Sequence, residues 1–223
     1  MRFAALASGG LDSSVMLRDL ALRAPVHPVY VRTGLLWENA EIYWLGRFLA
    51  EADIRGCEPP TVLELPVGDL YGAHWSLTGE GVPGFNTSLD SNYLPGRNLL
   101  LLSKVAVFCA LRGIPAIAMA PLSDNPFPDG TPAFFEGFAR VAADALDHGL
   151  TIEVPFRQIA KSEVVRRGRD LPLGSTFSCI QPSGLDHCGD CTKCAERQQG
   201  FATARVADPT RYRKAAAPRS RSA

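Results

Sequence analysis

The chain has 223 residues, of which 46% are hydrophobic, and this is enough for a domain with an ordinary buried core. Disorder along the whole chain is therefore excluded. Basic and acidic residues are equal in number, 23 each, but the chain from Arg205 onward holds six basic residues and one acidic one. Residues 1–204 therefore carry a net charge of −5, which gives no electrostatic reason to expect nucleic acid as a partner.

The apolar stretches are too short for membrane insertion or secretion. No uninterrupted apolar run approaches the roughly 18 residues that a membrane-spanning helix needs. The apolar start, residues 3–7, is shorter than the roughly 7–15 residues of a signal-peptide core. Four of the six cysteines crowd together near the C-terminus, which is typical of a metal site in a reducing compartment. We therefore expect a cytoplasmic protein without a membrane segment.

Short apolar runs alternate with helical periodicity along most of the chain. Gly113 and Gly149 are expected to end the helices that precede them. The alternation predicts an α/β fold, a doubly wound and mostly parallel sheet with helices on both faces. The predicted strands are 3–7, 26–31, 62–65, 114–119 and 150–154, and the predicted helices are 11–22, 37–50, 98–112, 131–148 and 160–169.

Two irregular stretches interrupt the alternation. Residues 68–95 are rich in Gly, Pro, Asn and Ser, and residues 121–132 contain four prolines. Long irregular segments in compact domains are usually functional, so we expect loops that cover a substrate, with disorder as the alternative. Residues 215–223 have a composition that cannot bury a core. We predict an ATP-binding domain over 1–174, a zinc-binding region packed on it over 175–206, and a basic, disordered tail over 207–223.

The string Ser-Gly-Gly-Leu-Asp-Ser-Ser at residues 8–14 lies where the first strand meets the first helix. Glycines let a ligand approach the backbone, and the free N–H groups of a helix N-terminus attract anions. Ser8, Ser13 and Ser14 add hydroxyl groups, whereas Asp12 suits an anion site only if it meets a cation. The string is also compatible with an ordinary strand–helix turn that Ser or Asp caps. It lacks the lysine of a Walker loop.

Four cysteines near the C-terminus follow the spacing C-x8-C-x2-C-x2-C, at Cys179, Cys188, Cys191 and Cys194. Such spacing brings four thiolates to one tetrahedral ion. We predict structural Zn²⁺, because thiolates fill every position and leave none open for water. An iron–sulfur cluster is the alternative metal centre, and disulfides or inert thiols are the alternatives without metal. His187 is an additional candidate ligand.

The loop string resembles the PP-loop of the ATP pyrophosphatases, which have a HUP-like α/β fold and cleave ATP between its α and β phosphates to adenylate an oxygen. Together with the cysteine spacing, it resembles the QueC family of 7-cyano-7-deazaguanine (preQ0) synthases. Residues 94–98, Leu-Pro-Gly-Arg-Asn, are similar to the family's V-P-G-R-N, and Lys161-Ser-Glu163 is similar to its K-x-E. The cysteine region matches C-G-x-C-x-x-C-x-x-R-x-x-G-F, so the resemblance spans residues 3 to about 201.

This resemblance implies a ligase that forms carbon–nitrogen bonds. The family uses ATP to adenylate 7-carboxy-7-deazaguanine for attack by ammonia, then activates the amide again to give the nitrile, releasing AMP and pyrophosphate. The implied partners are a small-molecule carboxylate, ammonia and a second copy of the chain in a homodimer, without membrane or nucleic acid. The implied cofactors are ATP, Mg²⁺ and structural Zn²⁺. The residues implied to hold the ATP phosphates are Ser8, Gly9, Gly10, Leu11, Asp12, Ser13 and Ser14.

Three residues are the catalytic candidates, Asp12, Arg97 and Lys161. The resemblance implies that Asp12 helps to place Mg²⁺ and that Arg97 and Lys161 neutralise phosphate or developing charge. As alternatives, Arg97 caps neighbouring structure and Lys161 lies on the solvated first turn of the 160–169 helix.

The chain departs from the family where specificity should reside. In place of the family's D-[FY]-S-G-Y-P-D-C-R, residues 123–132 keep only an aromatic residue and a Pro-Asp pair, and residues 33–38 lack the usual Y-G-Q. We therefore expect the activation chemistry to hold, while another carboxylate acceptor or a reaction that ends at the amide remains open. The further alternatives are tRNA thiolation and a non-catalytic nucleotide-binding regulator.

Overall fold

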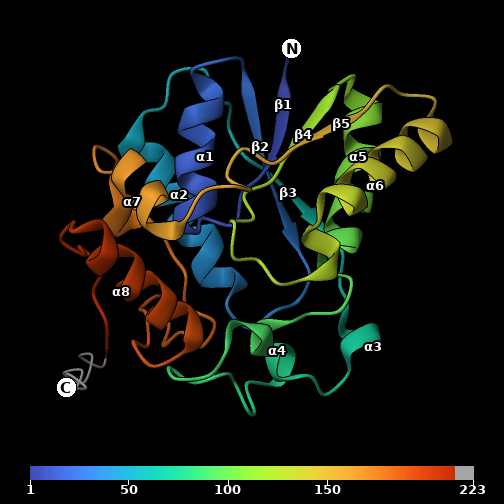
Figure 1. The fold of residues 1–223 in the computed structure, drawn as a ribbon. Coiled ribbons are helices and arrows are strands. Elements are labelled where there is room, and N and C mark those ends of the chain that lie inside the picture. The colour runs from blue at the N-terminus through green and yellow to red at the C-terminus, as the bar shows by residue number, and fades with distance from the viewer. Residues whose placement is uncertain (214–223) are drawn as a thin grey trace.

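The computed structural model describes residues 1–213, so the predicted disorder of residues 215–223 lies outside it. Five strands form one parallel sheet in the order β3-β2-β1-β4-β5 (Figure 1). The strands are β1 (Phe3–Leu6), β2 (Val26–Arg32), β3 (Thr61–Glu64), β4 (Ala116–Ala118) and β5 (Thr151–Glu153). Helices separate the strands along the chain, and the predicted α/β class is confirmed.

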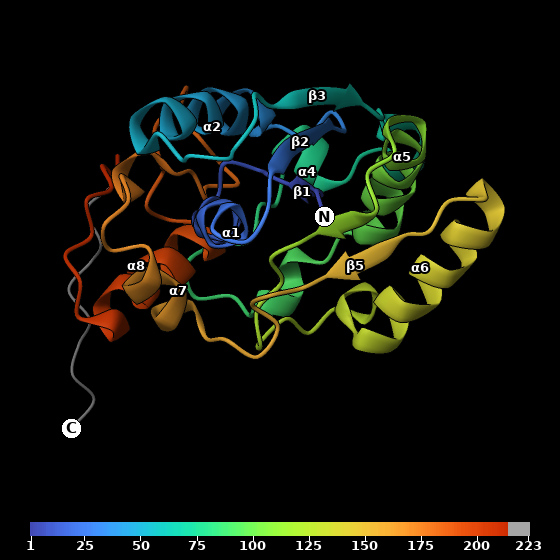
Figure 2. The same cartoon turned by 90° about the horizontal axis from the view of Figure 1, so that it is seen from above.

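Helices cover both faces of the sheet, as the two views show (Figures 1 and 2). One face carries α1 (Leu11–Ala21), α2 (Glu38–Ala52), α7 (Lys161–Arg167) and α8 (Thr192–Ala204). The other face carries α5 (Arg97–Arg112) and α6 (Pro132–Leu146). Because β1 pairs with β2 on one side and with β4 on the other, the order in which strands are added to the sheet reverses between β1 and β4. Doubly wound sheets bind ligands at the carboxyl ends of the strands at such a point.

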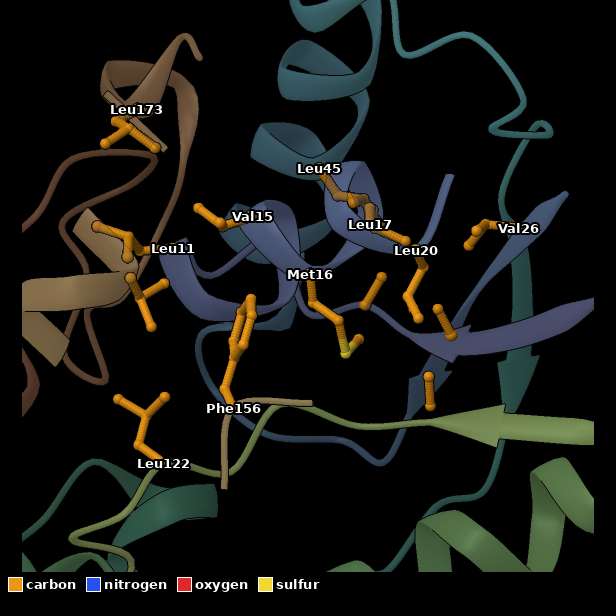
Figure 3. Packing of buried hydrophobic residues seen from close by; sticks show 14 of the residues in the cluster. Leu11, Val15, Met16, Leu17, Leu20, Val26, Leu45, Leu122, Phe156 and Leu173 are labelled. Atoms are coloured by element: carbon orange, nitrogen blue, oxygen red, sulfur yellow. The ribbon is translucent and has the colours of Figure 1, made fainter. Parts of the chain in front are cut away.

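The helix that follows the Ser-Gly-Gly string is anchored by its apolar side. Leu11, Val15, Met16 and Leu20 are each at most 1% exposed and belong to one cluster with Phe156 (Figure 3). Each such side chain contributes roughly 1.5–3 kcal/mol when it leaves water. The core therefore holds α1 rigidly, and with it the loop that precedes the helix.

Only one of the two glycines predicted to end a helix does so. Gly113 adopts a left-handed conformation, φ +63°, and ends α5 as predicted. The prediction that Gly149 ends the next helix was wrong. Asp147 takes the left-handed position instead, φ +46°, and its N–H bonds to the carbonyl of Ala143. Aspartate tolerates this conformation better than most side chains, so the helix ends before it reaches the glycine.

The two irregular stretches contain only short helical turns. Residues 68–95 and residues 121–132 surround the carboxyl end of the sheet, with α3 and α4 marked in Figure 1. A further turn, η3 (Leu173–Ser175), precedes the cysteine region. The turns in the two stretches are α3 (Gly68–Tyr71), α4 (Trp75–Thr78), η1 (Leu89–Asn92) and η2 (Pro128–Gly130).

The predicted tail, residues 207–223, is described only as far as residue 213. Tyr212 forms a β-bridge with His187, and the N–H of Arg213 donates to the carbonyl of His187 over 2.8 Å. This part of the predicted tail therefore packs against the cysteine region. Among residues 1–213, no helix has both the length and the apolarity to cross a membrane.

Candidate active site

A pocket of about 320 Å³ opens at the carboxyl end of the sheet, beside the ends of the neighbouring strands β1 and β4. The ends of β1 and β2 and the loop at residues 8–13 line its base. The two irregular stretches contribute residues 89–94 and 121–129, and α5 and α8 supply Arg97, Lys193 and Glu196. Segments that are far apart in the sequence thus converge on one cavity, and both predicted substrate loops border it.

The loop before α1 is shaped by close backbone contacts. Gly9 has a φ of +72°, and a Cβ atom there would lie 2.6 Å from the carbonyl oxygen of Glu41 in α2. A side chain at position 9 is therefore disfavoured both by conformation and by space. The N–H of Gly10 donates to Ser8 Oγ over 3.2 Å, and Ser13 Oγ donates to the Gly10 carbonyl over 3.1 Å. The resulting turn leaves the first amides of α1 ahead of the helical hydrogen-bond ladder, which begins at the N–H of Ser14.

The structure divides the seven residues of the predicted phosphate loop into two groups. Four of them line the pocket, Ser8, Gly10, Asp12 and Ser13. The other three support the loop from behind: Gly9 faces α2, the side chain of Leu11 lies in the core, and the Ser14 hydroxyl is buried with no hydrogen-bond partner among the described residues.

Lys161, the first residue of α7, lies between two carboxylates. Its Nζ is 2.6 Å from Asp12 Oδ2 and 2.8 Å from Glu196 Oε1, and its side chain is 11% exposed. Glu196 also pairs with Lys193. Burial by itself lowers the pKa of Lys161, but the charges of Asp12 and Glu196 outweigh burial and raise the pKa. The amine therefore stays protonated. The alternative of a solvated lysine does not hold. The side chain runs across Gly200, where a Cβ would lie 2.6 Å from its Cγ.

Arg97, at the start of α5, lines the pocket and does not cap the N-terminus of its helix. The α5 N-terminus is capped from residue 129 instead, since the Asn98 N–H donates to Asp129 Oδ2 over 2.8 Å. The Asn98 side chain also donates to the Asp129 carbonyl over 3.0 Å. Arg97 lines the pocket, and its buried Nε has no hydrogen-bond partner among the described residues. A buried, unpartnered donor is suited to receive an anionic ligand.

Glu41 is a pocket residue that the sequence did not single out. It lies on the buried side of α2, is 9% exposed, and accepts a hydrogen bond at Oε2 from the Tyr30 hydroxyl over 2.7 Å. Burial raises the pKa of Glu41 to about 7, although Arg97 and the Tyr30 hydrogen bond act in the opposite direction, and Glu38 adds to the increase. A glutamate within an amphipathic helix gives no sequence signal for this placement.

The four predicted metal ligands come together. The sulfurs of Cys179, Cys188, Cys191 and Cys194 all lie within 4.8 Å of one another, and two Sγ–Sγ distances are 3.9 Å. Four sulfurs at about 2.3 Å from a tetrahedral Zn²⁺ would lie about 3.8 Å apart, so the donor set fits this ion. All four thiols are free rather than joined as disulfides. The alternative of a disulfide framework is therefore not borne out.

His187 does not belong to this ligand set. Its Nε2 accepts a hydrogen bond from the N–H of Ser178 over 3.1 Å. Burial and the charge of Arg197 lower the pKa of His187 to about 3, so the ring is a neutral acceptor within the hydrogen-bond network.

Arg197 holds the cysteine region to the main domain. Its side chain is 1% exposed and donates to Thr210 Oγ1 over 2.7 Å, Thr176 Oγ1 over 2.8 Å and the Leu173 carbonyl over 2.7 Å. The sequence matched Arg197 to a family motif but assigned it no role. Five N–H donors in a planar fork suit such multiple contacts.

The cysteine region also supports the pocket. Cys191 forms a β-bridge with Gly84, and the next residue, Thr192, donates from its N–H to the Pro83 carbonyl over 3.1 Å. The Thr192 hydroxyl donates to Asn92, a pocket residue, over 2.6 Å. Helix α8 then carries Glu196 to the pocket wall. The four-cysteine cluster and the pocket are therefore parts of one packed unit.

The fold and the site define the class of this protein. It is an α/β protein with a parallel sheet, a PP-loop-like turn after the first strand and a four-cysteine site. A model of the family described as "Queuosine biosynthesis protein QueC" matches residues 2–205. The chain belongs to the QueC family.

Several curated proteins named 7-cyano-7-deazaguanine synthase resemble the chain over most of its length. The protein from Sphingopyxis alaskensis is 35% identical, with 93% of this chain and 96% of that protein covered. Those from Methanothrix thermoacetophila and Azoarcus sp. are 32% and 30% identical, each over 95% of this chain and over 98% and 96% of their own lengths. A solved structure described as a predicted subunit of tRNA methyltransferase from Methanocaldococcus jannaschii superposes with a TM-score of 0.49 and 15% identity, over 74% of this chain and 73% of that one.

Proposed function

We propose that this protein is an ATP-dependent ligase that adenylates a carboxylate, 7-carboxy-7-deazaguanine or a related acid, for attack by ammonia. The product is an amide and, after a second activation, a nitrile, with release of AMP and pyrophosphate. Family membership supports this reaction, since the curated relatives are named 7-cyano-7-deazaguanine synthase.

The observation that carries the proposal is the single pocket that joins the PP-loop-like turn to Arg97 and the two irregular stretches. Ser8, Gly10 and Ser13 offer hydroxyl and backbone groups at the N-terminus of α1, where the helix dipole favours phosphate. Arg97, at the start of α5, offers an unpartnered buried donor to the same pocket. The reaction needs a nucleotide and an acid held together, because adenylation depends on positioning and charge neutralisation.

The residues around Asp12 fit Mg²⁺. Asp12 Oδ1 is buried without a hydrogen-bond partner among the described residues, and Mg²⁺ prefers carboxylate oxygens together with phosphate oxygens. Lys161 holds the other oxygen, Oδ2, and so orients the carboxylate. When bound, Mg²⁺ would neutralise phosphate charge. In this proposal Lys161 acts by positioning Asp12 and Glu196 rather than by free contact with phosphate.

In this proposal residues 123–132, which depart from the family's motif, determine which carboxylate acceptor binds. Asp124, Asn125, Phe127 and Asp129 line the pocket, and Phe127 stacks on Tyr93 with ring centroids 5.3 Å apart. Because these side chains differ from the family's motif, we propose a carboxylate of the deazaguanine class without fixing its substituents. The homodimer and the cytoplasmic location stay predictions.

The test is a reaction of purified protein with ATP, Mg²⁺, ammonium and 7-carboxy-7-deazaguanine. We expect AMP and pyrophosphate in equal amounts, with the amide appearing before the nitrile. Arg97→Ala should reduce turnover at least tenfold, whereas Arg140→Ala, a change on α6 outside the pocket, should not. Absence of AMP formation with this acid and with a panel of related carboxylates would refute the proposal.

A further inference from the structure

The pocket holds several carboxyl groups, and the structure assigns most of them to fixed partners. Asp12 and Glu196 both pair with Lys161, and the charge of Lys161 outweighs burial and lowers the pKa of Glu196. Asp129 caps α5 through the N–H of Asn98, and Asp124 is exposed to solvent. Glu41 differs from all of these, because it is buried on the pocket wall and no cation lies in ion-pair contact with it in the described chain.

One oxygen of Glu41 is available to a ligand. The Tyr30 hydroxyl donates to Oε2 over 2.7 Å and fixes the orientation of the carboxyl group. The described residues provide no hydrogen bond to Oε1. The backbone of Glu41 packs against Gly9, so the carboxyl group is placed beside the loop that is proposed to hold the nucleotide.

We propose that Glu41 is the proton acceptor that converts bound ammonium into ammonia for attack on the acyl adenylate. This inference rests on the proposed function. Ammonium is the form of ammonia that prevails at neutral pH, and it has no lone pair with which to attack. A buried carboxylate attracts the cation and then removes one of its protons, which is general base catalysis at the nucleophile.

Ammonium gives one proton to Glu41 Oε1, and the nitrogen lone pair forms a bond to the acyl carbon. The bond between that carbon and the phosphate oxygen breaks, and its electron pair leaves with AMP. The remaining excess proton of the nitrogen passes to the departing phosphate oxygen. Glu41 returns its proton to solvent before the next cycle.

The surroundings of Glu41 suit this task. The groups that face it are Tyr30 from β2, Glu38 from its own helix and Arg97 from α5. Burial brings the pKa of Glu41 to about 7, near the pH at which a general base works best. Tyr30 does not compete for the role, because burial and the neighbouring Glu41 raise the pKa of its phenol and keep it protonated.

The test separates adenylation from amide formation in Glu41→Gln. Adenylation is measured as exchange of labelled pyrophosphate into ATP in the presence of the acid, without ammonia. Amide formation is measured with ammonium, and hydroxamate formation with hydroxylamine, which is largely unprotonated at neutral pH. We expect exchange and hydroxamate formation to stay within about twofold of the wild-type protein, while the ammonium-dependent rate at pH 7 falls at least 100-fold. Glu136→Gln, an exposed change on α6, is the matched control.

The pH profile gives a second, independent readout. Amide formation by the wild-type protein should rise with pH through about 7, whereas the Gln variant should recover only at alkaline pH, where free ammonia is present. Equal ammonium rates in the two proteins, or loss of exchange in the variant, would overturn the role of Glu41 and leave the proposed function intact. Wild-type protein without exchange on any carboxylate would overturn the proposed function and this inference together.

Discussion

Lys161 Nζ lies 2.6 Å from Asp12 Oδ2, although 149 residues separate the two along the chain. The contact ties the N-terminus of α7 to the first turn of α1, and Glu196 of α8 completes the network. Three helices that cover the same face of the sheet therefore meet at one buried ammonium group. The loop proposed to hold phosphate is fixed through this group as well as through the core.

Lys161→Met should strongly destabilise the protein. Its removal leaves the partly buried carboxylates of Asp12 and Glu196 without their shared cation, and breaking a buried ion pair on one side typically costs about 3–5 kcal/mol. Urea unfolding at neutral pH measures the loss. Lys104→Met, which changes an α5 lysine without an ion pair among the described residues, should change the unfolding free energy by less than about 1 kcal/mol. Similar losses in both variants would contradict the pairing.

Gly9→Ala should weaken both folding and nucleotide binding. The new Cβ would lie 2.6 Å from the Glu41 carbonyl in a left-handed conformation, so α2 or the loop must move, at a cost of roughly 1–3 kcal/mol. Gly46→Ala is a sharp control, because this residue lies within α2 with open space around it and should gain up to about 1 kcal/mol. Thermal unfolding and ATP calorimetry measure the pair. Equal effects of the two changes would show that the close approach is unimportant.

Loss of the metal ligands should damage the pocket as well as the cysteine region. We expect purified protein to carry one zinc ion per chain and Cys191→Ser to lose most of it. The variant should also lose ATP affinity, because Cys191 and Thr192 hold the segment that contains Pro83, Gly84 and Asn92. Elemental analysis and calorimetry test both effects. Cys57→Ser, at a half-buried thiol outside the cluster, should retain metal and ATP binding. Unchanged ATP affinity in metal-free protein would contradict the predicted coupling between the cysteine region and the pocket.

Glu41→Gln should stabilise the protein at neutral and alkaline pH. The folded-state pKa of Glu41, about 7, lies above its ordinary value of 4.5, so the folded state binds the proton more tightly. Its contribution to stability is complete below about pH 4.5 and is lost as the pH rises to about 7. The variant should therefore gain on the wild-type protein across this range, by about 3 kcal/mol at most. Denaturant unfolding at pH 5 and pH 8 measures the difference. A constant difference between the two pH values would contradict the raised pKa.

The exposed Glu136 provides the control for that experiment. Glu136→Gln lies on the solvated side of α6, away from the pocket, and should change stability equally at both pH values. A pH-dependent effect there would mean that the general charge of the protein, rather than the burial of Glu41, produces the difference.

The sequence alone determined the five strands, the helices α1, α2, α5, α6 and α7, the loop at residues 8–14 and the group of four cysteines, but it gave no prediction of α8 (Thr192–Ala204). Each of these follows from a local pattern, such as the apolar run from Phe3 to Ala7, the Gly-Gly turn or the fixed spacing of the cysteines. It failed at Gly149, where Asp147 ended the helix first, because the position of a helix end depends on which residue adopts the left-handed conformation. It also gave Arg97 and Lys161 similar roles, which their surroundings separate.

Only the tertiary structure decided the partners of those side chains. Lys161 meets Asp12 and Glu196 because the strand order puts α1, α7 and α8 on one face of the sheet. Glu41 reaches the pocket because α2 packs against Gly9, and its proton affinity follows from burial, which no spacing of residues in the sequence records. Local patterns specify elements, whereas contacts between distant segments specify charge, solvent access and therefore chemistry.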